Sequence, residues 1–255
     1  MSTLRSVGET AALIAALPNP GRVVVGIVGP PGAGKSTVAG QLVGLLNGAG
    51  RSPRAALLPM DGFHLPQSRL VELGRRDRMG APDTFDVDGF TAVLASLRPA
   101  AAPAAAPAAP PGAPPAAAPG PAVPPAASGT ALALGFGSPD VGNSGVTVLA
   151  PGFDREIEEP VPAAIVITPE FPIVVVEGNY LLLGDGGWER VAPLLDATFF
   201  VSVDRDIRLA RLIARHERFG KSPADARAWA LGPDERNAVL VGASAHAATH
   251  TIALG

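Results

Sequence analysis

A glycine-rich segment near the N-terminus ends in a lysine and two hydroxyl residues, and this pattern can bind phosphate groups. The segment from Gly29 to Thr37 reads GPPGAGKST and has the spacing G-x-x-x-x-G-K-[ST]. Its glycines allow a tight backbone turn, so that consecutive N–H groups and the positive end of the following helix can point at phosphate oxygens. The sequence therefore predicts a loop that binds the polyphosphate of a nucleotide.

Two side chains of this loop have separate expected roles. Lys35 can reach the β- and γ-phosphates, and Ser36 can place its hydroxyl on Mg²⁺. An ordinary Gly/Pro turn between a strand and a helix is the alternative, and it would need the Gly-Lys-Ser-Thr sequence to arise by coincidence. The expected nucleotide-binding residues of the loop are Gly29, Pro30, Pro31, Gly32, Ala33, Gly34, Lys35, Ser36 and Thr37.

Two carboxylates follow apolar runs that are typical of buried strands. Asp61 comes directly after residues 55–60, and Glu177 ends the run PIVVVE at residues 172–177. Ligands of open α/β sheets collect outside the carboxyl ends of the strands, so both acids are expected beside the phosphate loop. Asp61 could accept or orient the proton of an attacking hydroxyl, or it could cap the next turn. Glu177 could order Mg²⁺ or contact a substrate, or it could pair with Lys35 in the empty protein.

The helix expected after Asp204 carries a cationic face. Arginines at positions 208, 211, 215 and 218 fall within roughly an 80° arc of that helix. With the turn at Gly220 and the next helix, this segment could form a lid that closes over the γ-phosphate and excludes water. Arg211 and Arg215 are the expected catalytic arginines, although a solvated basic face is the more common role of such a stripe.

Several other residues near these motifs are candidates for contacting a substrate. His64 follows Asp61 by three residues, and Tyr180 follows Glu177 by three. Trp188 and Trp229 are instead expected to be packing residues. The substrate-binding candidates are His64, Arg78, Phe85, Asp86, Glu177 and Tyr180.

The elements that must position these residues alternate between strands and helices, which predicts an α/β fold with a mostly parallel central sheet. Strands of this sheet are expected at residues 22–28, 55–60, 172–177, 198–203 and 249–254, with a separate small hairpin from 146–150 and 164–168. Helices are expected within residues 1–17, at 36–48, 67–74, 87–97 and 205–220, after Ser222, and at 233–242.

A low-complexity segment interrupts this alternation. Residues 99–127 are almost entirely Ala and Pro and hold 11 of the 28 prolines. Prolines at this density block the hydrogen bonding of helices and sheets, and residues 128–145 continue the irregular pattern. We therefore expect residues 99–145 to be a disordered Ala/Pro-rich insertion within a single domain spanning residues 1–255.

Composition limits the partners of the chain. The 255 residues have a net charge of −3 and contain no cysteine, so disulfides and thiolate metal sites are excluded and nucleic acid is not an expected partner. No uninterrupted apolar run reaches the ~18 residues of a membrane span, and the N-terminus lacks a signal-peptide pattern. We expect a cytoplasmic protein with no membrane partner, and a homodimer is left open.

Taken together, these motifs resemble the phosphoribulokinase/uridine kinase family of P-loop kinases, which includes nucleoside kinases and bacterial pantothenate kinase. The resemblance rests on GPPGAGKST, MDGFH, RMGAPDTFD, PGFDREIEEP, VVVEGNYLLL and DRDIRLARLIARH, and it covers nearly the whole chain outside the N-terminal helix and the Ala/Pro segment. It implies the three-layer P-loop NTPase fold with a helical lid, and ATP and Mg²⁺ as cofactors.

The resemblance also implies the reaction and further site residues. The implied reaction is ATP-dependent phosphorylation of a hydroxyl on a small metabolite such as a sugar, a nucleoside or pantothenate. Asp61 matches the catalytic aspartate of the family, and Lys35 and Ser36 match its phosphate and Mg²⁺ ligands. Asn237 matches a position near the nucleotide base, although the surrounding GPDERN departs from the expected pattern.

Three alternative functions are weighed against this one. A GTPase switch would need the guanine-reading pattern Asn-Lys-Xaa-Asp, which the sequence lacks. A nucleotide monophosphate kinase or a dephospho-coenzyme-A-like kinase would need extra cations for an anionic acceptor. A non-catalytic ATP-binding module would have little reason to combine Asp61, Lys35 and the arginine face.

Overall fold

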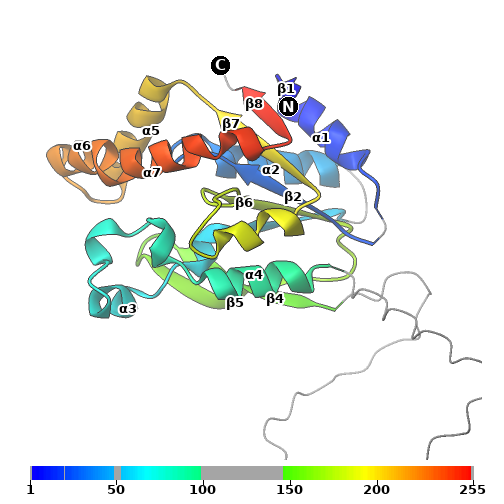
Figure 1. Cartoon of the computed structure of the whole chain (residues 1–255), viewed down its shortest axis with the longest axis horizontal. Coiled ribbons are helices and arrows are strands. Elements are labelled where there is room, and N and C mark those ends of the chain that lie inside the picture. Colours follow the sequence, from blue (N-terminus) through cyan, green and yellow to red (C-terminus); the bar gives the residue numbers. More distant parts are fainter. Residues whose placement is uncertain (1, 20, 49–52, 99–145, 254–255) are drawn as a thin grey trace, which may run out of the picture. The chain divides into compact units, whose positions relative to one another are not determined.

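The computed structural model describes residues 2–19, 21–48, 53–98 and 146–253 (Figure 1). The predicted insertion at residues 99–145 lies outside the described residues, so its expected disorder stays a prediction. The described residues on both sides of it, up to Arg98 and from Val146, belong to one compact unit.

A six-stranded parallel sheet forms the centre of this unit, as the sequence predicts. Its strand order is β1-β8-β7-β2-β6-β3, and every neighbouring pair is parallel. The strands are β1 (Ser2–Leu4), β2 (Val23–Val28), β3 (Ala55–Pro59), β6 (Ile173–Gly178), β7 (Ala197–Ser202) and β8 (His250–Ala253). The carboxyl ends of β2, β3 and β6 therefore meet at one edge, where the sequence places its candidate catalytic residues.

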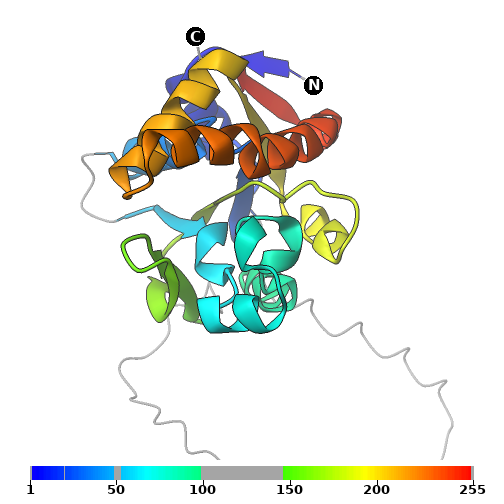
Figure 2. The ribbon, with the colours of Figure 1, turned by 90° about the vertical axis from the view of Figure 1, so that its left-hand side faces the viewer.

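Helices cover both faces of the sheet, which gives three layers (Figure 1). The helices are α1 (Val7–Ala15), α2 (Lys35–Asn47), α3 (Gln67–Glu72), α4 (Val87–Ser96), α5 (Arg205–Arg218), α6 (Pro223–Leu231) and α7 (Pro233–Ala243). Helices α5 and α6 occupy the segment expected to form a lid. Figures 1 and 2 both show α6 and α7 on the opposite side of the unit from α3 and the hairpin formed by β4 (Val148–Asp154) and β5 (Glu159–Ile167).

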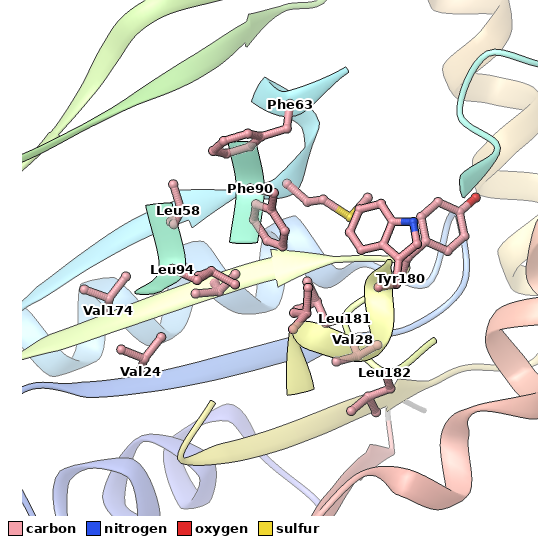
Figure 3. Packing of buried hydrophobic residues seen from close by; sticks show 14 of the residues in the cluster. Val24, Val28, Leu58, Phe63, Phe90, Leu94, Val174, Tyr180, Leu181 and Leu182 are labelled. Carbon is pink, nitrogen blue, oxygen red and sulfur yellow. The ribbon is translucent and has the colours of Figure 1, made fainter. Parts of the chain in front are cut away.

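Alternating side chains of the central strands explain the two packed faces. Val23, Val25 and Ile27 pack with residues of α1 and α2 on one face. Their neighbours Val24 and Val28 pack on the other face with α4, the hairpin and α7, and Figure 3 shows part of this second cluster. Successive side chains of a strand point to opposite faces, so a continuous apolar run such as VVVGIV is buried on both sides.

Two predicted elements need correction. The N-terminal segment is not helical throughout, because Ser2–Leu4 forms the edge strand β1 beside β8 before α1 begins. The hairpin lies outside the main sheet as expected, but both of its strands are longer than predicted. Their extension leaves residues 155–158 as a tight turn.

The glycine at position 62 is required because the hairpin backbone lies directly against it. A Cβ atom at this position would lie 2.0 Å from the carbonyl oxygen of Pro151. We expect Gly62→Ala to lower the free energy of unfolding by about 1–3 kcal/mol, and thermal unfolding should show a Tm lower by roughly 2–10 °C. Gly40→Ala is the matched control, since no atom lies within 4 Å of its added Cβ. An unchanged Tm for Gly62→Ala would contradict this close approach.

Candidate active site

The phosphate loop joins β2 to α2, as its sequence predicts. Gly34 precedes the first turn of α2 in the left-handed region, with φ 94°, and Gly32 also has a positive φ of 79°. A Cβ atom at Gly32 would lie 2.7 Å from Leu212 Cγ and 2.9 Å from the carbonyl oxygen of Arg208. The loop therefore turns tightly beneath α5 and needs glycine at this point.

Lys35, Ser36 and Glu177 meet at the mouth of this loop. The Lys35 Nζ donates to the carbonyl oxygen of Pro30 at 3.2 Å, so the side chain folds back over the loop. The Ser36 hydroxyl donates to Glu177 Oε1 at 3.0 Å. Mg²⁺ prefers oxygen ligands and keeps several waters, so a hydroxyl and a carboxylate beside a phosphate loop fit this ion. Among the described residues no group of three His, Cys, Asp or Glu side chains could hold a metal.

The electrostatics of these groups follow from their burial. Burial lowers the pKa of Lys35 to about 8, although the carboxylates of Glu177 and Asp61 oppose this shift. Burial and the neighbouring Asp61 carboxylate raise the pKa of Glu177, while Lys35 and the Ser36 hydroxyl oppose it. An anionic ligand such as phosphate would therefore stabilise the charged form of Lys35, and a cation would stabilise the charged form of Glu177.

Asp61 lies on the short 3₁₀ turn Met60–Phe63 that follows β3, and it forms an ion pair with Arg155 of the hairpin turn. The Arg155 Nη2 donates to Asp61 Oδ2 at 2.5 Å. Burial by itself would raise the pKa of the Asp61 carboxyl, but the neighbouring His64, Arg155 and Lys35 side chains together outweigh it and lower the pKa below its ordinary value. Asp61 is therefore an ionised hydrogen-bond acceptor at neutral pH.

His64 is held between two aromatic rings beside Asp61. Its ring centroid lies 4.0 Å from that of Phe85 and 4.8 Å from that of Phe153. The His64 Nδ1 lies 2.8 Å from the carbonyl oxygen of Asp61, and because a carbonyl oxygen only accepts, Nδ1 carries the proton. Burial lowers the pKa of His64 despite the nearby Asp61 carboxylate, so the neutral ring leaves its Nε2 as an acceptor.

One cleft brings most of the predicted residues together. It has a volume of about 170 Å³ and lies between the phosphate loop, the α5–α7 segment, the segment 76–85 that follows α3, and the hairpin. The predicted residues that line it are Pro31, Lys35, Ser36, Asp61, His64, Phe85, Glu177, Arg215 and Asn237.

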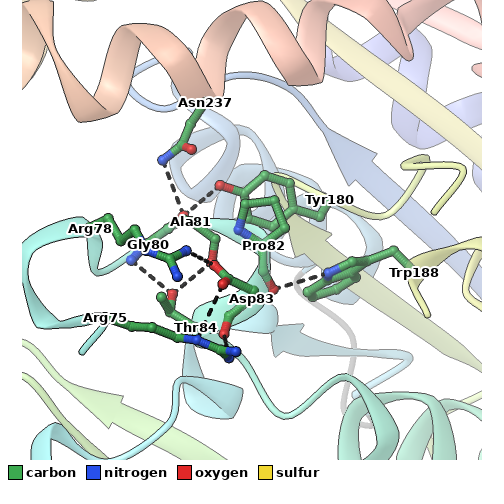
Figure 4. A network of polar contacts seen from close by, with 10 residues as sticks. All are labelled: Arg75, Arg78, Gly80, Ala81, Pro82, Asp83, Thr84, Tyr180, Trp188 and Asn237. Atoms are coloured by element: carbon green, nitrogen blue, oxygen red, sulfur yellow. Dashed lines mark hydrogen bonds and ion pairs between the residues drawn. The ribbon is translucent and has the colours of Figure 1, made fainter. Parts of the chain in front are cut away.

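Outside the phosphate loop, four candidates do not line the cleft, namely Arg78, Asp86, Tyr180 and Arg211. Arg78 pairs with Asp83, and Asp86 accepts from Gly89 N–H as the N-cap of α4. Tyr180 is fully buried, and its hydroxyl donates to the carbonyl oxygen of Gly80 at 2.5 Å (Figure 4). Arg211 is exposed on α5, one turn from Arg215. Asp86 and Tyr180 therefore make supporting contacts in this structure, and the predicted direct roles of all four residues stay untested.

Asn237 lines the cleft, and its side chain also contacts a neighbouring loop. Its amide donates to the carbonyl oxygen of Gly80 at 3.2 Å, the same oxygen that accepts from Tyr180 (Figure 4). Asn237 therefore holds the loop around residue 80, on the side of the cleft where Met79 and Phe85 lie. Its predicted contact with the nucleotide base stays untested, and this position favours a role in shaping the cleft.

Sequence reasoning missed several residues of the cleft. Arg155 and Glu158 come from the hairpin turn, and Arg76 pairs with Glu158 at 2.8 Å. On the α5–α7 side, Lys221 and Trp229 both line the cleft. The Lys221 Nζ lies 4.6 Å from the centroid of the Trp229 ring, so Trp229 has a contact beyond the packing role that the sequence predicts. The motif PGFDREIEEP contains two of these charged residues, but the pattern does not indicate which of them point inward.

Comparison with known proteins identifies the family. An ATP-dependent kinase-like protein of Aspergillus versicolor is 32% identical to this chain over 173 residues, which span 66% of this chain and 77% of that protein. A candidate uridine kinase of Schizosaccharomyces pombe is 28% identical over 202 residues, 76% of this chain and 66% of its own length. The chain belongs to the phosphoribulokinase/uridine kinase family of P-loop kinases.

The solved structure of a related kinase agrees with this assignment. A candidate fructose transport system kinase of Silicibacter sp. TM1040 superimposes with a TM-score of 0.73 at 27% identity, covering 97% of this kinase and 99% of that chain. No protein-family model matches the chain. Within the described part of this kinase, no helix has the length and apolar character needed to cross a membrane. The relatives and the shared fold show that this protein is an ATP-dependent kinase. The molecule that accepts the phosphate is a separate question.

The lowered pKa of Lys35 predicts that ATP binding depends on pH. Lys35 loses its proton in the nucleotide-free kinase as the pH rises through about 8, whereas bound phosphates would hold the proton towards the ordinary value of 10.5. Between these values the ATP complex binds more protons than the free kinase, so affinity should fall by up to about tenfold per pH unit. Calorimetric titration from pH 6.5 to 9.5 measures this, with Lys35→Arg as the control that keeps its charge. An affinity for ATP that is constant over this range would contradict the prediction.

Proposed function

We propose that this kinase transfers the γ-phosphate of ATP to a hydroxyl group of an uncharged small metabolite. The observation that carries the proposal is the position of Asp61, an ionised acceptor in the same cleft as the phosphate-loop residues Lys35 and Ser36. Phosphoryl transfer needs a phosphate cradle, cations for the developing charge and a group that orients the attacking hydroxyl. The cleft contains a residue suited to each of these needs.

The proposed step divides the work among residues of this chain. The acceptor oxygen forms a bond to the γ-phosphorus while the bond from that phosphorus to the bridging oxygen of ADP breaks. Asp61 accepts the hydrogen bond of the attacking hydroxyl, and its proton leaves to the carboxylate or to the transferred phosphate. Lys35 and Arg215 neutralise the charge that develops on the phosphate oxygens and on ADP.

Ser36 and Glu177 are the residues that would hold Mg²⁺. The ion, when bound, would supply neutralisation of the phosphate charge. The raised pKa of Glu177 supports this role, because a carboxylate that is buried beside a second carboxylate, Asp61, is stabilised by an incoming cation.

Charge on the acceptor side argues against the nucleotide monophosphate kinase and dephospho-coenzyme-A-like alternatives. We define the acceptor side as the cleft residues Asp61, His64, Arg76, Phe153, Arg155 and Glu158. Both arginines of this side are already paired, Arg155 with Asp61 at 2.5 Å and Arg76 with Glu158 at 2.8 Å. A phosphorylated acceptor would need unpaired cations there, and this supports an uncharged acceptor instead.

A screen of ATP consumption tests the proposal. The purified chain is incubated with ATP and Mg²⁺ and with fructose, uridine, cytidine, nicotinamide riboside or pantothenate, and ADP release is followed by a coupled assay. At least one uncharged acceptor should stimulate ADP release well above the rate without acceptor. The proposal fails if no acceptor in the screen raises ADP release, or if only phosphorylated acceptors added to the screen do so.

A further inference from the structure

The ion pair between Asp61 and Arg155 leaves hydrogen-bonding capacity unused on both partners. Only Oδ2 of Asp61 accepts from Arg155, and among the described residues Oδ1 has no hydrogen-bond donor. The Arg155 guanidinium has five N–H donors, and within the described part of the chain Asp61 is its one hydrogen-bond acceptor. A free acceptor atom and free donors therefore lie side by side at the cleft.

Both side chains of the pair are accessible to a ligand in the cleft. The Arg155 side chain is 46% exposed and the Asp61 side chain 26% exposed, so a small molecule in the cleft can reach both. The hairpin that carries Arg155 packs closely beside Asp61, because its backbone at Pro151 lies against Gly62.

Such a pair matches two oxygens on adjacent carbons. Two oxygens in this arrangement lie roughly one hydrogen-bond length, about 2.8 Å, apart. The hydroxyl that attacks phosphorus can donate to the free oxygen of Asp61. An oxygen on the neighbouring carbon can then accept from a free N–H of Arg155, and this second contact fixes the rotation of the attacking hydroxyl.

We propose that Arg155 is a specificity-determining residue that binds the oxygen on the carbon next to the reacting hydroxyl, so that the acceptor is an uncharged molecule with oxygen on both of these carbons. This inference rests on the proposed function, because it assumes that Asp61 orients the acceptor. Sugars and the ribose of nucleosides have this arrangement. Pantothenate does not, because the carbon beside its primary hydroxyl carries only carbon substituents, and it is also an anion.

The acceptor screen separates this inference from the proposed function. Fructose and uridine, which carry the neighbouring oxygen, should include the best acceptor, and pantothenate should be inactive. Panthenol, the uncharged alcohol that corresponds to pantothenate, separates the effect of charge from that of the missing oxygen and should also be inactive. Panthenol as the best acceptor would overturn the role of Arg155 while leaving the kinase proposal intact, whereas pantothenate as the best acceptor would overturn both the role of Arg155 and the uncharged acceptor. A screen with no active acceptor would instead overturn the proposed function.

Variants of Arg155 supply a second readout that a structural role would not move. Arg155→Gln should raise the KM of the best acceptor about tenfold to a hundredfold, with a smaller change in kcat and no change in the KM of ATP. Arg69→Gln is the matched control, because Arg69 pairs with Glu72 on the exposed surface of α3, outside the cleft. An unchanged acceptor KM in Arg155→Gln would overturn the inference.

The pH profile distinguishes charge from geometry. Arg155 lowers the pKa of Asp61, so its removal should move the acid limb of kcat/KM to higher pH. Arg155→Lys keeps the charge and should largely restore the acid limb, but a lysine cannot offer the same planar fork and should leave the KM raised. The other titratable groups that face Asp61 are unchanged in both variants, namely His64, Lys35, Arg215 and Glu177. An acid limb that does not move in Arg155→Gln would contradict the pairing of these two residues in the working enzyme.

Discussion

Asp61→Asn should lower kcat by about a hundredfold to ten-thousandfold while the affinity for ATP changes little. The substitution keeps the size of the side chain but removes the negative charge that accepts the hydrogen bond of the attacking hydroxyl. It also leaves Arg155 without its carboxylate partner at 2.5 Å. The phosphate loop is untouched, so binding of ATP, measured by calorimetry or by fluorescence of an ATP analogue, should stay close to wild type.

A matched aspartate provides the control for this result. Asp88 pairs with Arg190 at the surface, with its side chain 87% exposed and outside the cleft. Asp88→Asn should therefore keep wild-type kcat and KM. Wild-type turnover in Asp61→Asn, measured with the best acceptor of the screen, would remove Asp61 from the mechanism.

Lys35→Met should lower kcat/KM by about a hundredfold to a thousandfold, because it removes a buried cation that neutralises the phosphates in the transition state. Methionine has a similar length and no charge. Since burial lowers the pKa of Lys35, the empty protein holds this charge at a cost, and its removal should not reduce stability. Steady-state kinetics and thermal unfolding of the same preparation measure both effects.

Catalytic activity and thermal stability should respond differently to Lys35→Met. Loss of activity with an unchanged or higher Tm is the expected pattern. A large fall in Tm would show that Lys35 has a structural role, and activity near wild type would show that the loop does not neutralise phosphate through this residue.

The central residues could be predicted because parallel strands share an edge. Asp61 and Glu177 each follow an apolar run, and once those runs pair in a parallel sheet their carboxyl ends must meet beside the phosphate loop. Pro59 lies two residues before Asp61 and pairs in register with Glu177, so the two acids lie at the ends of neighbouring strands. No knowledge of side-chain direction is needed for residues that sit at such an edge.

Arg155 could not be found in the same way. Its position depends on the length of the two hairpin strands, and the sequence indicates shorter ones because Pro and Gly interrupt the apolar pattern at residues 150–163. The strands are extended by pairing across a bulge between Ala150 and Gly152, which is a long-range effect. Only this extension brings the charged turn up to Asp61.

Proximity in sequence was a poor guide to which side chains face the cleft. Tyr180 lies three residues from Glu177, yet its ring packs in the core and its hydroxyl supports Gly80. Arg211 and Arg215 lie on nearly the same face of α5, but they are separated by one turn, or about 6 Å along the axis. Both side chains are exposed, but of the two only Arg215 is among the residues that line the cleft.

The most direct test of the central claim is the stoichiometry of phosphoryl transfer. The purified chain, ATP, Mg²⁺ and the best acceptor of the screen are incubated together, and ³¹P nuclear magnetic resonance follows ADP, inorganic phosphate and phosphomonoester. We expect one phosphomonoester for each ADP, with little inorganic phosphate, and the loss of both products in Asp61→Asn. Formation of ADP with an equal amount of inorganic phosphate and no phosphomonoester would contradict it.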